Sequence, residues 1–188
     1  SLLSWLIPIY WFVCVVIVIV LTAPYLASGP AAQYRVVLAD QPKPPRNSTW
    51  FWIFQTVSSM TNTGMSLCDS SLSNPLRQSY MMLVPQMILI IIGNTGFPIM
   101  LRFVIWFMSQ CVSKHSRTYE TLSFLLDHPR RCYLYLFPSH NTWFLLFVLF
   151  ILTVSDWFLL MICDLATRHA FPSNGTWIIS SLFQSVST

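Results

Sequence analysis

Three long apolar runs divide the chain. They cover residues 5–26, residues 81–107, and the stretch from Trp143 to about Leu165. An α-helix rises 1.5 Å per residue, so about 20 residues cross a hydrocarbon core roughly 30 Å thick. Each run is long enough to do this, and the first carries no charge at all. The pattern therefore predicts three membrane-spanning helices.

A shorter apolar stretch lies between the first two runs. Residues 47–68 carry no charge, yet eleven of these 22 residues are Ser, Thr, Asn or Gln. The compact apolar part, residues 50–54, is too short for a span, and the segment is too polar to face lipid. We therefore predict a re-entrant helix over about residues 49–58, capped by Ser48 or Thr49 and followed by a polar turn.

The same order of elements occurs twice. Residues 54–58 read FQTVS, and residues 183–187 read FQSVS, 129 positions later. Each copy follows an apolar run, a polar loop and an N-glycosylation sequon, at Asn47 and at Asn174. Because internal repeats are common in transporter folds, we interpret the two copies as equivalent short helices.

The repeat predicts how the chain is divided. Residues 1–108 form a complete repeat, with spans at about 5–26 and 81–107, a pore helix at about 49–58 and a filter at about 61–65. Residues 109–140 form a linker, and residues 141–188 hold the first span and the pore helix of the next repeat. The chain starts inside an apolar run and stops just after an amphipathic stretch, so we expect it to be an internal piece of a larger polypeptide.

Glycosylation and charge predict the sidedness. If the short helix is re-entrant, two crossings separate Asn47 from Asn174, and both sequons lie on the same side, as glycosylation requires. Residues 109–140 lie between those crossings and carry Lys114, Arg117, Arg130 and Arg131. By the positive-inside rule this linker is cytoplasmic, and the sequon-bearing loops are then extracellular.

Composition points to the same class. Hydrophobic residues make up 55% of the chain and charged residues 9%, whereas soluble domains carry about 25% charged residues. The net charge of +4 reflects membrane topology rather than nucleic-acid binding. The five cysteines stand singly, and we find no metal-ligand spacing, phosphate-binding loop or hydrolase motif. We expect an all-α transmembrane protein with a lipid bilayer as its surroundings, no cofactor and no enzymatic activity.

The polar turn after the short helix has the composition of an ion filter. It consists of Thr61, Asn62, Thr63, Gly64 and Met65. A potassium ion sheds its water only where oxygens replace that water at similar energy, and backbone carbonyls can do this. Such a turn needs unusual dihedrals, which glycine accepts and asparagine tolerates. The residues alone also fit an ordinary polar loop, but their place between two spans favours a filter for potassium.

Other residues within the second and third runs invite two readings each. Gly93, Gly96 and Pro98 should kink or loosen the second span, either as a gating hinge or as a tight helix contact. Arg102 is either an anchor that snorkels to the membrane interface or a positive barrier in the ion path. Asp156 should face protein or water, because a charge at the bilayer centre costs roughly 2.5–3.5 kcal/mol, and it serves either helix packing and hydrogen bonding or the attraction of a cation.

Several blocks resemble the fungal Trk-type potassium transporters. They lie at residues 54–58 and 63–65, at residues 92–103 (IGNTGFPIMLRF), at residues 123–132 (SFLLDHPRRC), and at Ser155-Asp156 with Asp164-Leu165. The resemblance implies four helix–pore helix–filter–helix repeats around one path, as in potassium channels. This chain would hold the second repeat and the opening of the third, with Gly64 as the single filter glycine. It also implies inward potassium movement across the plasma membrane and, from bacterial relatives, a homodimer; sodium as a second ion stays open.

Two alternatives compete with this interpretation. A two-span potassium channel subunit would assemble as a tetramer with a more glycine-rich filter, which this sequence lacks. A polytopic membrane enzyme or receptor would need a polar cluster shared between spans, and the motifs offer none.

Overall fold

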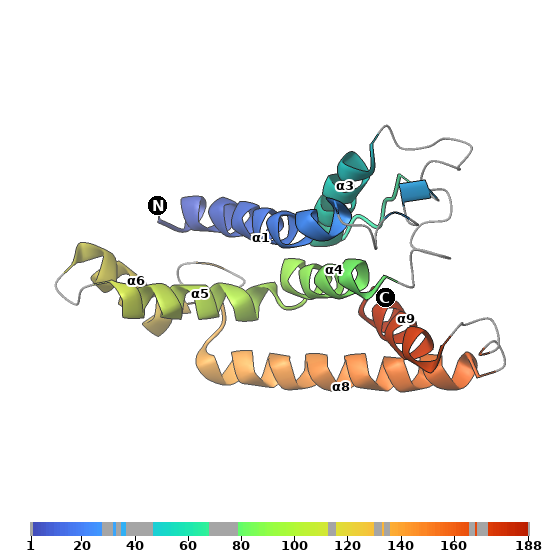
Figure 1. Ribbon diagram of the computed structural model, residues 1–188. Coiled ribbons are helices and arrows are strands. Elements are labelled where there is room, and N and C mark those ends of the chain that lie inside the picture. The colour runs from blue at the N-terminus through green and yellow to red at the C-terminus, as the bar shows by residue number, and fades with distance from the viewer. Residues whose placement is uncertain are drawn as a thin grey trace. The chain divides into compact units, whose positions relative to one another are not determined.

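The structure is a computed structural model, and every regular element in its described part is a helix. The described residues are 2–27, 47–67, 79–112, 116–129, 136–165 and 173–187, with the single residues 32, 35, 36, 133 and 168. The chain forms two compact units, and we describe each by itself: Ser1–Asn94 with Ser155–Thr188, and Thr95–Val154 (Figure 1). Most of the proline-containing loop before Asn47 falls outside the described residues, as do residues 113–115, 130–132 and 134–135 of the predicted linker.

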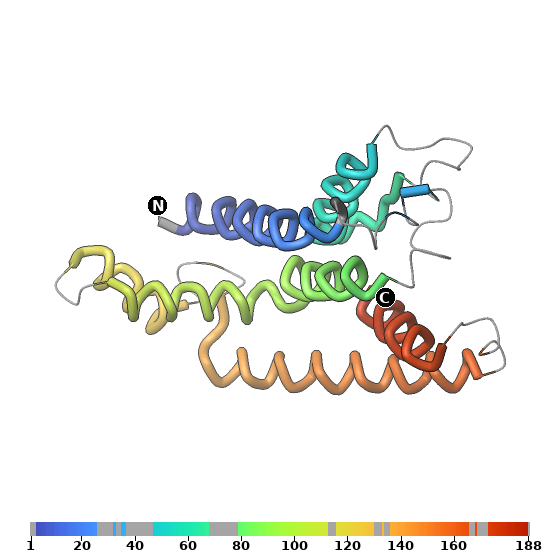
Figure 2. Tube along the Cα trace, viewed as in Figure 1, coloured from blue at the N-terminus to red at the C-terminus, as the bar shows by residue number. Residues whose placement is uncertain are grey.

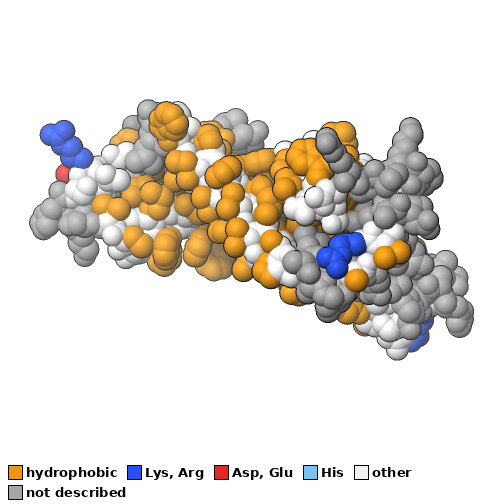
Figure 3. All heavy atoms as spheres, turned by 45° about the horizontal axis from the view of Figure 1, so that its top comes forward, with side chains coloured by type: hydrophobic (Ala, Val, Ile, Leu, Met, Phe, Trp, Pro, Cys, Tyr) orange, Lys and Arg blue, Asp and Glu red, His pale blue; other side chains and the backbone are white. Residues whose placement is uncertain are grey.

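Within the described part of the chain, two helices are long and apolar enough to cross a membrane. They are α1 (Leu2–Ala27) and α8 (Ser139–Cys163), of 26 and 25 residues. Their bounds lie within four residues of the predicted spans. Most of their apolar side chains are exposed, as is typical of helices that face lipid, and hydrophobic side chains cover much of the face seen in Figure 3.

The predicted second span is divided into two helices in the structure. α4 (Tyr80–Gly93) and α5 (Phe97–Cys111) together qualify as one candidate span, but the helix is broken at Asn94–Gly96. Pro98 lies in the first turn of α5, where its missing N–H costs no intrahelical hydrogen bond. The interruption that was expected around Gly93, Gly96 and Pro98 is therefore present.

The first unit packs two short helices against α4. α3 (Ser48–Thr61) contacts α1 and α4, and α9 (Asn174–Ser187) also contacts α4 (Figure 2). Phe51 and Trp52 of α3 pack with residues of α4, and α1 and α9 add partly buried side chains to this core. The Trp52 indole N–H also donates a hydrogen bond to the Thr22 hydroxyl of α1. Phe51 and Trp52 of the apolar patch are thus buried in the core, whereas Trp50 is exposed.

The second unit contains a helix that was not predicted. α6 (Arg117–Asp127) lies within the stretch interpreted as a linker and packs against α5. The Ser116 hydroxyl caps it by accepting a hydrogen bond from the Thr118 N–H at 3.3 Å. Leu122 and Leu125 are buried and Arg117 is exposed, so α6 is an amphipathic helix with one face in the unit.

Candidate ion filter

The short helix α3 has well-defined caps at both ends. At its start the Asn47 side-chain oxygen accepts a hydrogen bond from the Thr49 N–H at 3.2 Å, so the N-cap is Asn47 and not the predicted Ser48 or Thr49. At its end, Asn62 adopts the left-handed conformation (φ 51°, ψ 34°). The Asn62 N–H bonds to Ser59 O and the Thr63 N–H to Ser58 O, the paired hydrogen bonds of a Schellman motif.

The helix continues three residues beyond its predicted end at Ser58. Thr61, expected as the first filter residue, is the last residue of α3, and its hydroxyl donates to Val57 O at 2.9 Å. The remaining predicted filter residues, Asn62 to Met65, lie outside the helix and are exposed. The non-helical part of the candidate filter therefore begins at Asn62.

Gly64 is a second residue with left-handed backbone. Its φ is 68°, and a Cβ placed there would meet no heavy atom within 4 Å. The requirement for glycine is therefore conformational rather than steric. Another L-residue there would cost roughly 1–2 kcal/mol. The unusual dihedrals that were expected at Asn62 and Gly64 are both observed.

Ser58 ties the turn back to the helix that precedes it. Its hydroxyl lies 2.6 Å from the Met65 carbonyl oxygen, to which it donates, and 3.2 Å from the Thr63 hydroxyl. Thr61 and Thr63 are linked in turn, with their hydroxyl oxygens 2.9 Å apart. The sequence does not predict this role of Ser58, although Ser58 is the last residue of the repeated FQTVS pattern.

The C-terminal part of α4 supports the same region. The Asn62 side-chain amide donates to Ile90 O at 3.4 Å, and the Tyr10 hydroxyl of α1 donates to Ile92 O at 3.0 Å. Gly93 packs directly on the backbone of Met60: a Cβ on Gly93 would overlap the Met60 carbonyl oxygen and lie 3.0 Å from its carbonyl carbon. Of the two readings of this glycine region, the structure supports a tight helix contact at Gly93.

Electrostatics at the turn come from the backbone. The last turn of α3 holds no basic residue, so no side-chain charge there offsets the partial negative charge of the helix C-terminus. Among the described residues, no group of three or more His, Cys, Asp or Glu could hold a metal ion. What the turn offers to a cation is a row of short polar residues and their carbonyl oxygens.

The other predicted site residues are not part of this turn. Arg102 belongs to the second unit, where its guanidinium donates to Phe137 O at 2.6 Å. Asp156 is exposed on α8. Asn47 is exposed at the start of α3, and Asn174 is exposed as the first residue of α9, where its side-chain oxygen accepts a hydrogen bond from Arg168 at 2.8 Å.

Comparison with known proteins decides the family. The TrkH model, described as a cation transport protein, matches residues 1–188. The chain belongs to the TrkH family. TrkH membership, together with the two or three candidate spans found among the described residues, makes it an all-α, multi-pass membrane protein and confirms the predicted fold class. It also confirms the resemblance to Trk-type transporters and favours a transporter over an enzyme.

Individual TrkH relatives are fungal potassium transporters. The low-affinity potassium transport protein of Saccharomyces cerevisiae is 44% identical over 141 residues, which are 74% of this chain and 16% of that protein. The high-affinity potassium transport protein of the same yeast is 36% identical over 189 residues, covering 100% of this chain and 15% of that protein. Potassium transport protein 1 of Schizosaccharomyces pombe is 39% identical over 140 residues, 74% of this chain and 16% of that protein. The chain thus spans about one sixth of the length of these relatives.

Proposed function

We propose that this chain is part of a transporter that moves potassium ions into the cell across the plasma membrane. The family and the names of the relatives support a potassium transporter. One observation connects the proposal to particular residues: Ser58 holds a turn at the C-terminal end of α3, a helix that packs against α1 and α4. Residues 1–108 would then be one helix–pore helix–filter–helix repeat, residues 109–140 a linker, and residues 141–188 the start of the next repeat.

In the proposed mechanism, carbonyl oxygens replace the water around potassium. The free-energy cost of removing this water is offset only if the replacing oxygens are already in place. A turn that is hydrogen-bonded to the preceding helix holds its carbonyl oxygens in place. The Met65 carbonyl oxygen already accepts the Ser58 hydroxyl, so the better candidate ligands are the carbonyls of Asn62, Thr63 and Gly64. The C-terminal end of α3 adds a favourable potential for a cation without a fixed charge.

Sidedness and assembly complete the proposal. Asn47 and Asn174 would carry glycans outside the cell, and the linker with α6 would lie in the cytoplasm. A glycan is attached to the side-chain nitrogen of asparagine, so the Asn47 oxygen that caps α3 stays free to do so. Following the resemblance, two copies would form the transporter, with potassium as the transported ion and no cofactor; sodium is the ion against which selectivity should be measured.

Gly64→Ser in the full-length transporter tests the filter assignment. The substitution places an L-residue where φ is 68°, so the turn should rearrange. We expect rubidium uptake in potassium-uptake-deficient yeast to fall roughly tenfold, which corresponds to a loss of about 1.4 kcal/mol in the stabilisation of the ion by displaced carbonyls. The preference for potassium over sodium should also decrease.

The matched control is Ile88→Leu, an exchange at an exposed apolar position of α4 in the same unit. Surface abundance is measured for both variants by biotinylation, so that loss of transport is separated from loss of protein. If Gly64→Ser shows normal uptake and unchanged ion preference at normal abundance, residues 61–65 do not form the filter.

A further inference from the structure

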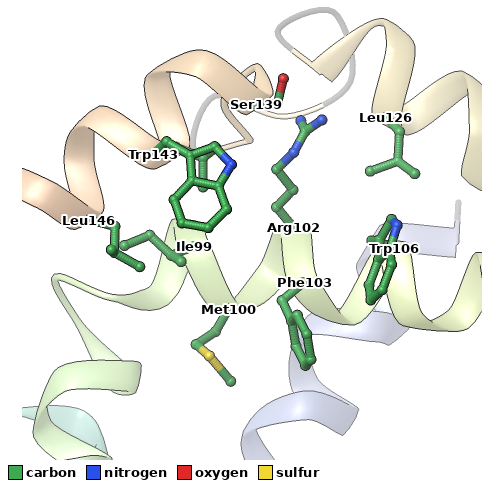
Figure 4. A pocket seen from close by; sticks show the side chains of 10 residues that line it. Ile99, Met100, Arg102, Phe103, Trp106, Leu126, Ser139, Trp143 and Leu146 are labelled. Carbon is green, nitrogen blue, oxygen red and sulfur yellow. The ribbon is translucent and has the colours of Figure 1, made fainter.

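The second unit contains a cavity that the proposed filter does not use. Its volume is about 660 Å³, and side chains of α5, α6 and the start of α8 line it. Most of the lining is apolar, including Phe103, Trp106, Leu126, Trp143 and Leu146, as Figure 4 shows. A cavity with such a lining takes hydrocarbon rather than water.

One end of the cavity is polar and positively charged. Arg102 extends from α5 toward Ser139, the first residue of α8 (Figure 4). Among the described residues, Phe137 O is the only hydrogen-bond acceptor for this guanidinium. Asp127 of α6 attracts it electrostatically, but no described carboxylate forms an ion pair with it. Arginine has five N–H donors in a planar fork, and the described residues use only one of them. The Thr142 hydroxyl, by contrast, is occupied by Pro138 O at 3.0 Å.

The pairing of a cationic end with an apolar body matches one class of molecule. We propose that this cavity binds an acidic phospholipid, with its phosphate on Arg102 and part of an acyl chain against the apolar side chains of α5 and α8. A guanidinium fork matches the geometry of phosphate oxygens. Trp106 and Trp143 are of the type that lies at the level of lipid headgroups.

Charge along the chain supports the same occupant. The stretch that joins α5 to α8 carries Lys114, Arg117, Arg130 and Arg131, which is the bias expected of a cytoplasmic surface. Anionic phospholipids make that surface of a membrane negative. Arg102 would therefore meet acidic headgroups where they are abundant. This role is an alternative to the interfacial anchor and to the barrier in the ion path, and it does not depend on the filter assignment.

Lipid binding to the purified full-length transporter tests the inference. The protein is delipidated in detergent and titrated with phosphatidylserine or with phosphatidylcholine that has the same acyl chains, and binding is followed by native mass spectrometry. We expect saturable binding that favours phosphatidylserine. Arg102→Gln should weaken it roughly tenfold, because a charge-assisted contact is lost, and Arg102→Lys should weaken it less.

Two further variants make the test specific. Arg117→Gln removes an equal charge from an exposed position of α6 and should change phosphatidylserine affinity less than about twofold. Leu146→Trp adds bulk to the apolar part of the cavity and should weaken phosphatidylserine binding while leaving Arg102 in place. Each variant is used only if its thermal melting matches that of the wild type within the error of the assay.

Three results would overturn the proposal. These are equal affinity for the two lipids, unchanged phosphatidylserine affinity in folded Arg102→Gln, and absence of saturable lipid binding to the wild type. The last is the result expected if another segment of the full-length polypeptide fills the cavity. Rubidium uptake is not the readout here, so failure of the filter assignment would leave this test intact.

Discussion

At the scale of single residues, the candidate filter depends on one serine and two left-handed positions. Asn62 and Gly64 turn the chain, and Ser58 holds the end of the turn through the Met65 carbonyl. A buried hydroxyl that donates to a backbone carbonyl contributes about 1 kcal/mol net, and more is lost if the acceptor stays unpaired. Ser58 therefore sets how firmly the carbonyls of residues 62–64 are held.

Removing that hydroxyl should loosen the turn without unfolding the protein. In Ser58→Ala the Met65 carbonyl loses its donor and Thr63 loses a neighbour at 3.2 Å. We expect uptake of rubidium to fall about three- to tenfold and the preference for potassium over sodium to decrease, since 1 kcal/mol corresponds to roughly a fivefold change.

Ser59→Ala is the matched control for this experiment. Ser59 is the next residue of α3 and is also buried, but no described hydrogen bond joins its hydroxyl to the turn. It should retain near-normal uptake and selectivity. Equal losses in both variants would mean that the effect comes from helix packing and not from the link to Met65.

The sequence predicted part of this arrangement. Gly64 and Asn62 could be identified because their residue types accept left-handed backbone, and that expectation is confirmed. The link from Ser58 to Met65 could not, because it joins residues seven positions apart only after the helix has ended and the chain has reversed. The end of α3 was placed three residues early because Thr61, a weak helix former, still completes the last turn through its bond to Val57 O.

At the scale of elements, the contact between α3 and α4 positions the turn. Gly93 lies where any side chain would overlap the Met60 carbonyl, so the end of α4 rests on the last turn of α3. Gly93→Ala must move one helix away from the other, and such overpacking typically costs 1–3 kcal/mol. We expect a lower melting temperature of the purified full-length transporter and reduced uptake.

Gly175→Ala provides a graded comparison for Gly93→Ala. A Cβ on Gly175 would lie 3.1 Å from the Tyr80 hydroxyl, the end of a side chain that can shift, so its effect should be smaller. If Gly93 acts only as a flexible hinge, Gly93→Ala should change uptake while leaving the melting temperature unaltered. That outcome would contradict the packing role.

The sequence predicts those helices whose formation depends on length and hydropathy, but not the helix that depends on tertiary packing. The long runs of α1 and α8 have too many consecutive apolar residues for any other structure in a membrane, and the break before Pro98 follows from proline's missing donor. α6 was missed because its helix is short and lies in a charged stretch. Isolated helices of 11 residues are marginal, so α6 depends on contacts with α5 that no local pattern reveals.

At the scale of the whole molecule, topology depends on how the pair α4 and α5 is read. If α4 and α5 form one broken span, that span and α8 make two membrane crossings between the sequons, so Asn47 and Asn174 lie on the same side. If α4 and α5 form a re-entrant hairpin, they do not cross the membrane. Only α8 then crosses it, and the two sequons lie on opposite sides. Our proposal requires the first reading, and glycosylation distinguishes the two.

Glycan mapping on the full-length protein provides that test. Thr49→Ala removes the first sequon yet keeps the Asn47 oxygen on the Thr49 N–H, so the α3 cap survives; Asn174→Gln removes the second. Each change should remove one glycan from the mobility shift produced by endoglycosidase, and together they should remove two. Lys114→Asn completes a sequon with Ser116 in the linker and should add none. A glycan at the linker position, with one native sequon unused, would place an odd number of crossings between Asn47 and Asn174, and the assignment of α4 and α5 to one span would then be wrong.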